Sequence, residues 1–316
     1  MRRPTCGVRA IASVGLLGAA VGASCTVDRH GLRAPRAEGG VDRAPDASDA
    51  LEPGRDGGLH DDGSSDGRTE DPDAAGAMDA TAADAGLQRR REGLVALYTF
   101  EEGTGNVVRD RSGLDPPLDL VLGDPTPPAA HWRRGAIRFD RSNILQTSGA
   151  ATRLTDACRT SGEVSIEAWV EPDNETQGGP ARIVTVSADP HFRNVTIGQD
   201  GSSWIARIRT SGFGDLNGMP QISTATRIVL ASAPSQIVFV RETSGWARLY
   251  VNGLLVVLTT RGGDLTNWDP SFRLALGNEL TNDRPWLGTF HLVAIYCDAL
   301  TEADVLRHYR LGPDAE

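Results

Sequence analysis

Aromatic residues are confined to one part of the chain, and this limits where a folded core can form. The sequence has 6 Trp, 4 Tyr and 7 Phe residues, all of them between Tyr98 and Tyr309. A segment without aromatic residues has little large apolar surface to bury, so we expect no core before Tyr98. Of the 316 residues, we therefore assign 91–316 to one folded domain, a length that suits a single all-β sandwich.

The first 25 residues have the pattern of an export signal. Three arginines precede an apolar stretch, IASVGLLGAAVGA, at 11–23. This stretch is too short to span a bilayer and has the length of the apolar part of a signal peptide. Small residues lead directly into Cys25, which resembles the lipobox of bacterial lipoproteins, where the Cys thiol is diacylated. The alternative is ordinary signal-peptidase cleavage near Ser24.

Residues 26–90 are predicted to form a disordered acidic linker. They are rich in Asp, Gly, Ala and Pro, and no apolar period of a helix or strand persists in them. Together with the signal, this predicts an exported protein in the cell envelope, lipid-anchored at the outer membrane, or a secreted one. The net charge of −10 argues against nucleic acid as a partner, and against the membrane except through a lipid anchor.

The rest of the chain alternates between β-rich runs and turn residues, which favours a sandwich or jelly roll. Asn252-Gly253 is a strong hairpin signal, because a type I′ turn needs positive φ at both positions. One short helix is predicted at 301–310, with Thr301 as its cap. The expected strands are 94–101, 117–122, 135–140, 143–147, 163–171, 181–187, 193–198, 203–209, 222–230, 235–242, 246–251, 254–260, 272–277 and 288–296.

Four stretches resemble the laminin G-like jelly roll of the concanavalin A-like lectin/glucanase superfamily. They are GLVALYTFEEGTGNVVRDRSG (93–113), EVSIEAWVEP (163–172), QIVFVRETSGWARLYVNGLLV (236–256) and the closing stretches at 272–279 and 286–309. The resemblance implies an all-β, two-sheet jelly-roll sandwich with one short C-terminal helix.

Taken together with the export signal, the linker and the lack of catalytic motifs, the resemblance predicts a noncatalytic, surface-displayed module, a monomer that binds polysaccharide or a surface glycoprotein. A protein-binding adhesive or structural module is the alternative, and a glycoside hydrolase of the same fold is a third. Glu163 and Glu167 are the nearest match to a glucanase carboxylate pair. Four positions along a strand cover about 13 Å, whereas a retaining glycosidase needs about 5 Å.

Exposed aromatic side chains would form a sugar-binding surface, because sugar rings stack on them. The candidates flank predicted strands or lie in loops; the alternative for each is core or edge packing. They are Trp204, Phe213, Trp268 and Trp286. Trp169 and Trp246 are predicted to be core residues.

Calcium is the one cofactor that the resemblance suggests, at a loop rim that offers carboxylate and carbonyl oxygens. Asp110 is the best candidate ligand, and the alternative for it is a turn cap. Asn278, Glu279 and Asp283 are further candidates in a later loop. The family usually has Ile-Asp-Glu-Val in its last strand, where this chain has Phe-His-Leu-Val at 290–293, so two acids are missing.

Cys158 and Cys297 are predicted to form a disulfide. Cys158 precedes the strand at 163–171, and Cys297 follows the strand at 288–296. The two cysteines meet if these strands are antiparallel neighbours, and an exported location permits the bond. Two buried free thiols are the alternative.

Overall fold

The structure is a computed structural model that describes residues 88–127 and 129–314. The predicted signal peptide, Cys25 and nearly all of the predicted linker lie outside the described residues. No helix within the described ranges is long and apolar enough to cross a membrane.

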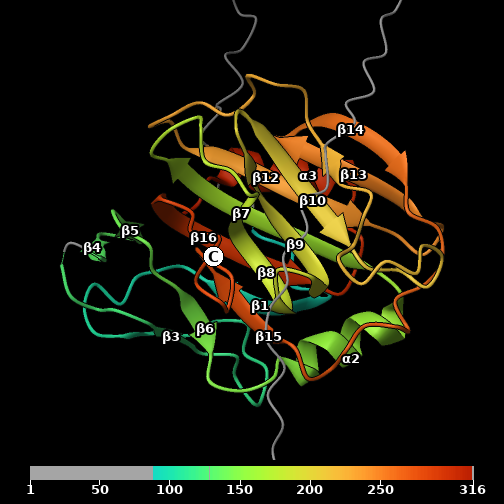
Figure 1. Ribbon diagram of the computed structural model, residues 1–316, viewed down its shortest axis with the longest axis horizontal. Coiled ribbons are helices and arrows are strands. Elements are labelled where there is room, and N and C mark those ends of the chain that lie inside the picture. Colours follow the sequence, from blue (N-terminus) through green and yellow to red (C-terminus); the bar gives the residue numbers. More distant parts are fainter. Residues whose placement is uncertain (1–87, 128, 315–316) are drawn as a thin grey trace, which may run out of the picture. The chain divides into compact units, whose positions relative to one another are not determined.

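Two antiparallel sheets form a sandwich, which confirms the predicted fold class (Figure 1). Sheet A has the order β14-β13-β12-β7-β16-β5-β4, with β1 also paired to β16. Sheet B has the order β11-β10-β9-β8-β15-β6-β3-β2.

The strands of sheet A are β1 (Leu94–Tyr98), β4 (His131–Arg133), β5 (Ala136–Phe139), β7 (Val164–Pro172), β12 (Ser235–Arg241), β13 (Trp246–Val251), β14 (Leu254–Thr260) and β16 (Gly288–Tyr296). Those of sheet B are β2 (Val107–Val108), β3 (Leu120–Leu122), β6 (Leu145–Thr147), β8 (Ala181–Asp189), β9 (Phe192–Asp200), β10 (Ser203–Ile208), β11 (Ile222–Ser223) and β15 (Arg273–Leu276).

The central strand β7 shows how the sequence directs burial. Successive side chains of a strand point to opposite faces, so Val164, Ile166, Ala168 and Val170 lie together in the core between the sheets. The opposite face of β7 is not open to solvent around Glu167, which is fully buried.

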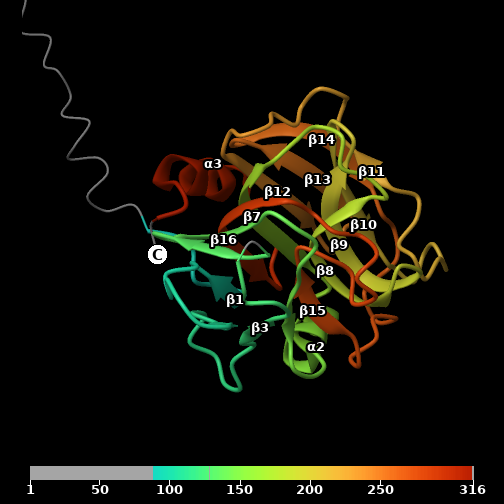
Figure 2. The same ribbon diagram turned by 60° about the vertical axis from the view of Figure 1, so that its left-hand side comes forward.

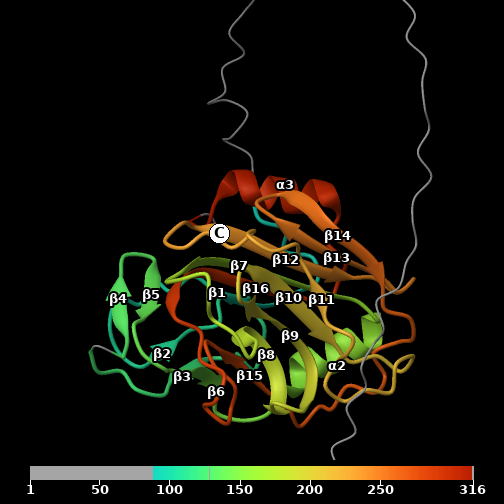
Figure 3. The ribbon, with the colours of Figure 1, turned by 45° about the horizontal axis from the view of Figure 1, so that its top comes forward.

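Helix α3 (Glu302–Leu311) covers this outer face of sheet A (Figures 2 and 3). The Thr301 side chain accepts a hydrogen bond from the backbone N–H of Asp304, and the Asp304 side chain accepts one from Thr301 N–H, so the predicted cap is confirmed. Val305 is buried against the sheet. The ring of Tyr309 stacks on Trp169 at a centroid distance of 5.8 Å.

The disulfide between Cys158 and Cys297 is present, with Cα atoms 4.5 Å apart. Strands β7 and β16 are antiparallel neighbours, as the argument for the disulfide required. Cys158 lies in the last turns of a helix that the sequence did not predict, α2 (Thr152–Ser161). The bond therefore fastens α2 to the end of β16.

The folded domain begins before residue 91, contrary to the predicted boundary. The Arg89 side chain is buried and donates from Nη1 to Glu167 Oε1 at 2.7 Å and from Nη2 to the Gly312 carbonyl at 2.9 Å. The backbone N–H of Arg90 donates to His308 Nε2 at 3.0 Å. The end of the predicted linker thus packs against α3.

Candidate functional site

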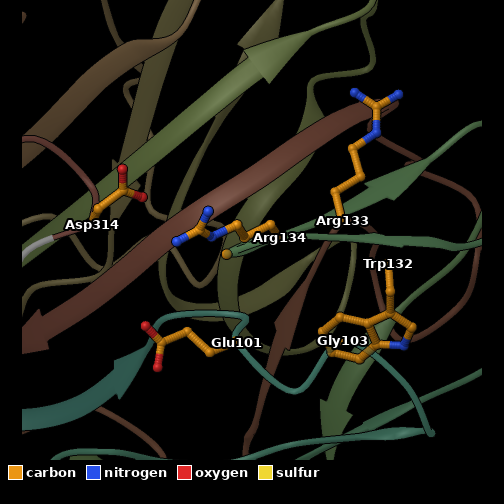
Figure 4. Close-up of a pocket in the computed structure, with 7 residues that line it drawn as sticks. Glu101, Gly103, Trp132, Arg133, Arg134 and Asp314 are labelled. Atoms are coloured by element: carbon orange, nitrogen blue, oxygen red, sulfur yellow. The ribbon is translucent and has the colours of Figure 1, made fainter.

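A cavity of about 950 Å³ opens beside the β4–β5 hairpin at one edge of sheet A (Figure 4). Its size falls in the range of small-molecule sites. Its walls combine one aromatic ring with two cations and two carboxylates. The lining residues are Glu101, Gly103, Trp132, Arg133, Arg134, Gly135 and Asp314.

Trp132 forms the aromatic wall and is held in place by the turn that follows β1. Its indole Nε1 donates to the Gly105 carbonyl at 3.0 Å. The backbone there needs glycine, because Gly103 and Gly105 have φ of 66° and 88°. The sequence EEGTG therefore shapes one wall of the cavity.

The charged side chains of the cavity are not paired with one another. Arg133 and Arg134 are exposed, and neither side chain forms a hydrogen bond or ion pair among the residues that the structure describes. Figure 4 shows the Arg134 guanidinium extending to the side where Glu101 and Asp314 lie, while Arg133 points away from them. The cavity thus offers unpaired donors and acceptors beside an aromatic ring.

Three of the four aromatic residues predicted to bind ligand do not face solvent. Trp204, Trp268 and Trp286 are buried, so the prediction is wrong for them. Two of them place their indole N–H inside the protein: Trp268 donates to the Arg209 carbonyl at 2.8 Å, and Trp286 donates to Gln199 Oε1 at 3.0 Å.

The two remaining aromatic side chains, Phe213 and Trp246, are exposed. Phe213 is exposed in a loop, 5.7 Å from the Arg261 guanidinium, and it does not line the cavity. Trp246, predicted as a core residue, is also exposed. Trp132 was not singled out from sequence, because nothing local distinguishes it from the buried tryptophans.

Asp110, the best calcium candidate, uses both carboxylate oxygens within the protein. Oδ1 accepts from the backbone N–H of Leu97 and of Ser112, at 3.1 and 2.9 Å. Oδ2 accepts from Leu118 N–H at 3.0 Å and from Arg153 Nη2 at 2.9 Å. These contacts are those of a turn cap that also ties β1 to α2.

The later loop uses its polar side chains in the same way. Asn278 Oδ1 accepts from the backbone N–H of Arg284 at 3.0 Å. The buried Glu279 accepts from Arg182 Nε at 3.1 Å. Asp283 pairs with Arg284 at 2.9 Å. In residues 88–127 and 129–314, no three His, Cys, Asp or Glu side chains are grouped so that they could hold a metal.

Glu163 and Glu167 are both committed to structural contacts. Glu163 Oε2 accepts from the backbone N–H of Ala299 at 3.0 Å, while Glu167 is covered by α3 and paired with Arg89. Neither carboxylate lines the cavity.

Comparison with known proteins agrees with this architecture. A laminin G profile, described as "Concanavalin A-like lectin/glucanases superfamily", matches residues 146–306, roughly half of the chain. No curated protein matches the chain by sequence.

Similar solved structures share the fold at low identity. A Trypanosoma rangeli sialidase in complex with the inhibitor DANA has a TM-score of 0.51 and 12% identity, covering 72% of this chain and 34% of the sialidase. The receptor binding domain of the botulinum neurotoxin C/D mosaic serotype has a TM-score of 0.50 and 9% identity, covering 71% of this chain and 52% of that one. The chain thus spans about a third of the sialidase and about half of the neurotoxin domain. The two-sheet sandwich and the profile match together show that the chain belongs to the concanavalin A-like lectin/glucanase superfamily.

Proposed function

We propose that this domain is a noncatalytic carbohydrate-binding module whose site is the cavity beside the β4–β5 hairpin. The observation that carries the proposal is the combination of Trp132 with unpaired cations and carboxylates in one open cavity. Sugar rings stack on an aromatic face, and their hydroxyls exchange hydrogen bonds with charged side chains. A polysaccharide or surface glycoprotein is the proposed ligand.

The superfamily contains both lectins and glucanases, so the fold alone does not choose between binding and hydrolysis. Support for binding comes from the two acids of the cavity. Glu101 and Asp314 are both exposed, whereas a general acid normally needs burial to raise its pKa. One structural relative is a receptor binding domain and another is a sialidase. An experiment must therefore separate binding from hydrolysis.

The test is a glycan-array screen of the full chain, in calcium and again in EDTA. We expect saturable binding to one class of glycan, and loss of binding in EDTA would show that the binding needs a divalent cation such as calcium. Trp132→Ala should weaken binding about two- to tenfold, because an aromatic contact is worth about 0.5–1.5 kcal/mol. The matched control is Phe192→Ala, an exposed aromatic on β9 that does not line the cavity.

Two results would overturn the proposal. Binding that Trp132→Ala and Phe192→Ala affect equally would remove the cavity as the site. Release of reducing sugar from the bound glycan would identify a glycoside hydrolase instead.

We also propose that the protein is exported and anchored in the outer membrane by a lipid on Cys25. The apolar run at 11–23 and the small residues before Cys25 support this. Metabolic labelling with a radioactive fatty acid tests it, because Cys25→Ser should abolish the label and release the protein from the membrane.

A further inference from the structure

His308 on α3 is a fully buried histidine that hydrogen bonds through both ring nitrogens. Its Nδ1 lies 2.8 Å from Glu167 Oε2 on β7. Its Nε2 accepts from the backbone N–H of Arg90 at 3.0 Å. Figure 2 shows the described chain beginning beside α3, and we call residues 88–91 there the N-terminal segment. The ring therefore joins this segment to the central strand of sheet A.

The two hydrogen bonds of the ring allow only one protonation state. Glu167 is charged, because the Arg89 charge and the hydrogen bonds to the carboxylate overcome the effect of burial and hold its pKa well below the usual range. A carboxylate only accepts hydrogen bonds, so Nδ1 must carry a proton. A backbone N–H only donates, so Nε2 must carry none where it meets Arg90. His308 is therefore neutral in this structure, with its proton on Nδ1.

A second proton on the ring would disturb the N-terminal segment in two ways. It would sit on Nε2 and face the N–H of Arg90, so two donors would meet and this hydrogen bond would be lost. It would also bring a second cation to Glu167, which Arg89 Nη1 already contacts at 2.7 Å. Arg89, Glu167 and His308 are at most 2% exposed, and an unbalanced charge is costly where water is excluded.

The other acids near the ring are already paired with an arginine. Asp304 lies on α3 one turn before His308 and contacts Arg90 Nη1 at 3.2 Å. Asp298, just after β16, also pairs with Arg90. Tyr296 on β16, whose ring centroid is 6.1 Å from that of His308, stays neutral because burial raises its pKa. The ionisable groups around the ring are thus Glu167 on β7, Tyr296 on β16 and Asp298 after it, Arg89, Arg90 and Arg91 in the N-terminal segment, and Asp304 with its partner Arg307 on α3, while Gln236 on β12 is neutral.

We propose that a proton on His308 replaces Arg89 as the partner of Glu167, so that the N-terminal segment leaves α3 when the pH falls. The docked state holds the Arg89–Glu167 ion pair beside a neutral ring. The released state holds a His308–Glu167 ion pair, and the Arg89 guanidinium enters water. One proton is taken up for each segment released, and the buried charge stays balanced. The hydrogen bond from Arg89 to the Gly312 carbonyl at 2.9 Å is lost in the same step.

The uptake of one proton sets the direction and the limit of the pH dependence. Histidine side chains usually gain a proton between about pH 8 and about pH 5. Because the released state binds one proton more than the docked state, the ratio of docked to released molecules falls as the pH falls, by at most about tenfold per pH unit. Release would add the N-terminal segment to the linker that the sequence predicts before it.

Amide hydrogen exchange in the full chain, followed by NMR between about pH 8 and about pH 5, tests the proposal. The probe is the Arg90 amide, and its protection factor corrects for the intrinsic effect of pH on exchange. We expect this factor to fall by up to about tenfold per pH unit once His308 gains its second proton. The amide of Val305, which donates to the Thr301 carbonyl at 3.0 Å within α3, should keep its protection because the helix stays folded.

The imidazole nitrogens give an independent readout by 15N NMR. At about pH 8, Nδ1 of His308 should be protonated and Nε2 should not. Protonation of Nε2 and loss of protection at the Arg90 amide should have the same midpoint. His308→Gln removes the titrating ring and should remove the pH dependence of this protection. The matched control His191→Gln, at an exposed histidine in the turn between β8 and β9, should retain it.

The natural chain alone can refute the proposal. A neutral ring with its proton on Nε2 would do so, as would Arg90 protection that does not change with pH, or different midpoints for the ring and the amide. These measurements remain decisive even where His308→Gln does not fold. A pH dependence that persists in a folded His308→Gln variant would assign the release to another group and would also refute the proposal.

Discussion

At the scale of single residues, Glu167 is the side chain on which both ends of the domain converge. Its carboxylate accepts from Arg89 Nη1 at 2.7 Å, Trp169 Nε1 at 3.0 Å, Gln236 Nε2 at 2.9 Å and His308 Nδ1 at 2.8 Å. Burial alone would raise the pKa of Glu167, but the Arg89 charge and the hydrogen bonds from His308 and Gln236 together hold this pKa well below its usual range. The carboxylate is therefore charged inside the protein.

Removing this carboxylate should destabilise the fold strongly. Glu167→Ala removes the carboxylate that faces the buried Arg89 guanidinium, and breaking one side of a buried pair costs about 3–5 kcal/mol. Urea unfolding measures the change in the free energy of unfolding. The matched control Glu92→Ala removes an exposed acid whose ion pair with Arg90 is 3.8 Å long, and it should change stability by less than about 0.5 kcal/mol. Equal losses in both variants would show that Glu167 has no special role.

The lowered pKa of Glu167 predicts how the free energy of unfolding changes with pH. A carboxyl whose folded pKa is lowered stabilises the protein above its unfolded pKa, near 4.5, and this contribution is lost as the pH falls, because the unfolded state then binds more protons. The isosteric Glu167→Gln variant has no carboxyl group to titrate at this position, so it lacks this contribution at every pH. The difference in unfolding free energy between the two proteins should therefore shrink between about pH 7 and about pH 3. A difference that is constant over this interval would contradict the lowered pKa.

At the scale of elements, the sequence predicted best where local chemistry decides the conformation. The turn at Asn252-Gly253 joins β13 to β14 as predicted, with φ of 51° and 78° at its two central residues. The pair could be recognised from sequence because few residues other than Asn and Gly adopt positive φ at low cost. The start of α3 followed from Thr301 for a similar local reason.

The elements that the sequence missed depend on contacts between distant segments. The N-cap position of helix α2 is Ala151, whose side chain cannot accept a hydrogen bond, so no local start signal exists. The strand predicted over 222–230 is reduced to Ile222–Ser223, because only two residues pair with β10. Tertiary packing decides both cases, and a single sequence does not show it.

The disulfide between α2 and β16 should contribute much of the domain's stability. It joins residues separated by 139 positions, and closing a loop of that length is worth about 4–5 kcal/mol in the chain-entropy model. The double variant Cys158→Ala/Cys297→Ala should lower the melting temperature, measured by calorimetry. A reducing agent should lower the melting temperature of the natural chain and leave that of the double variant unchanged. A reducing agent that acts equally on both would contradict the assignment.

At the scale of the whole molecule, the fold could be predicted from the sequence but the site could not. The sandwich could be predicted because the motifs occur in order along the chain and each one corresponds to a strand or a turn. The cavity instead joins Glu101, Trp132 and Asp314, which lie far apart in sequence and meet only in the folded chain. Conversely, Trp204 and Trp286 lie beside turns in sequence and yet fill the core.

The contacts of the N-terminal segment make the two ends of the domain interdependent. A chain that starts at Glu92 lacks Arg89 and Arg90, and so loses the contacts to Glu167, Gly312 and His308. We expect its free energy of unfolding to be lower than that of a chain that starts at residue 88 by about 3 kcal/mol or more, since Glu167 is left without its arginine. Its unfolding midpoint in urea should fall accordingly. Indistinguishable midpoints for the two truncated chains would show that the segment is dispensable.

The bond from Arg89 to the Gly312 carbonyl has a mechanical consequence. Gly312 precedes Asp314, which lines the cavity, by two positions, so the point where the chain enters the domain is fastened next to the proposed site. Tension between the N-terminal segment and a bound ligand would pass through Arg89 into the C-terminal residues. Because Arg89 also pairs with Glu167 on β7, part of this load would reach the central strand of sheet A, so the C-terminal residues beside the site and the sheet would resist pulling together.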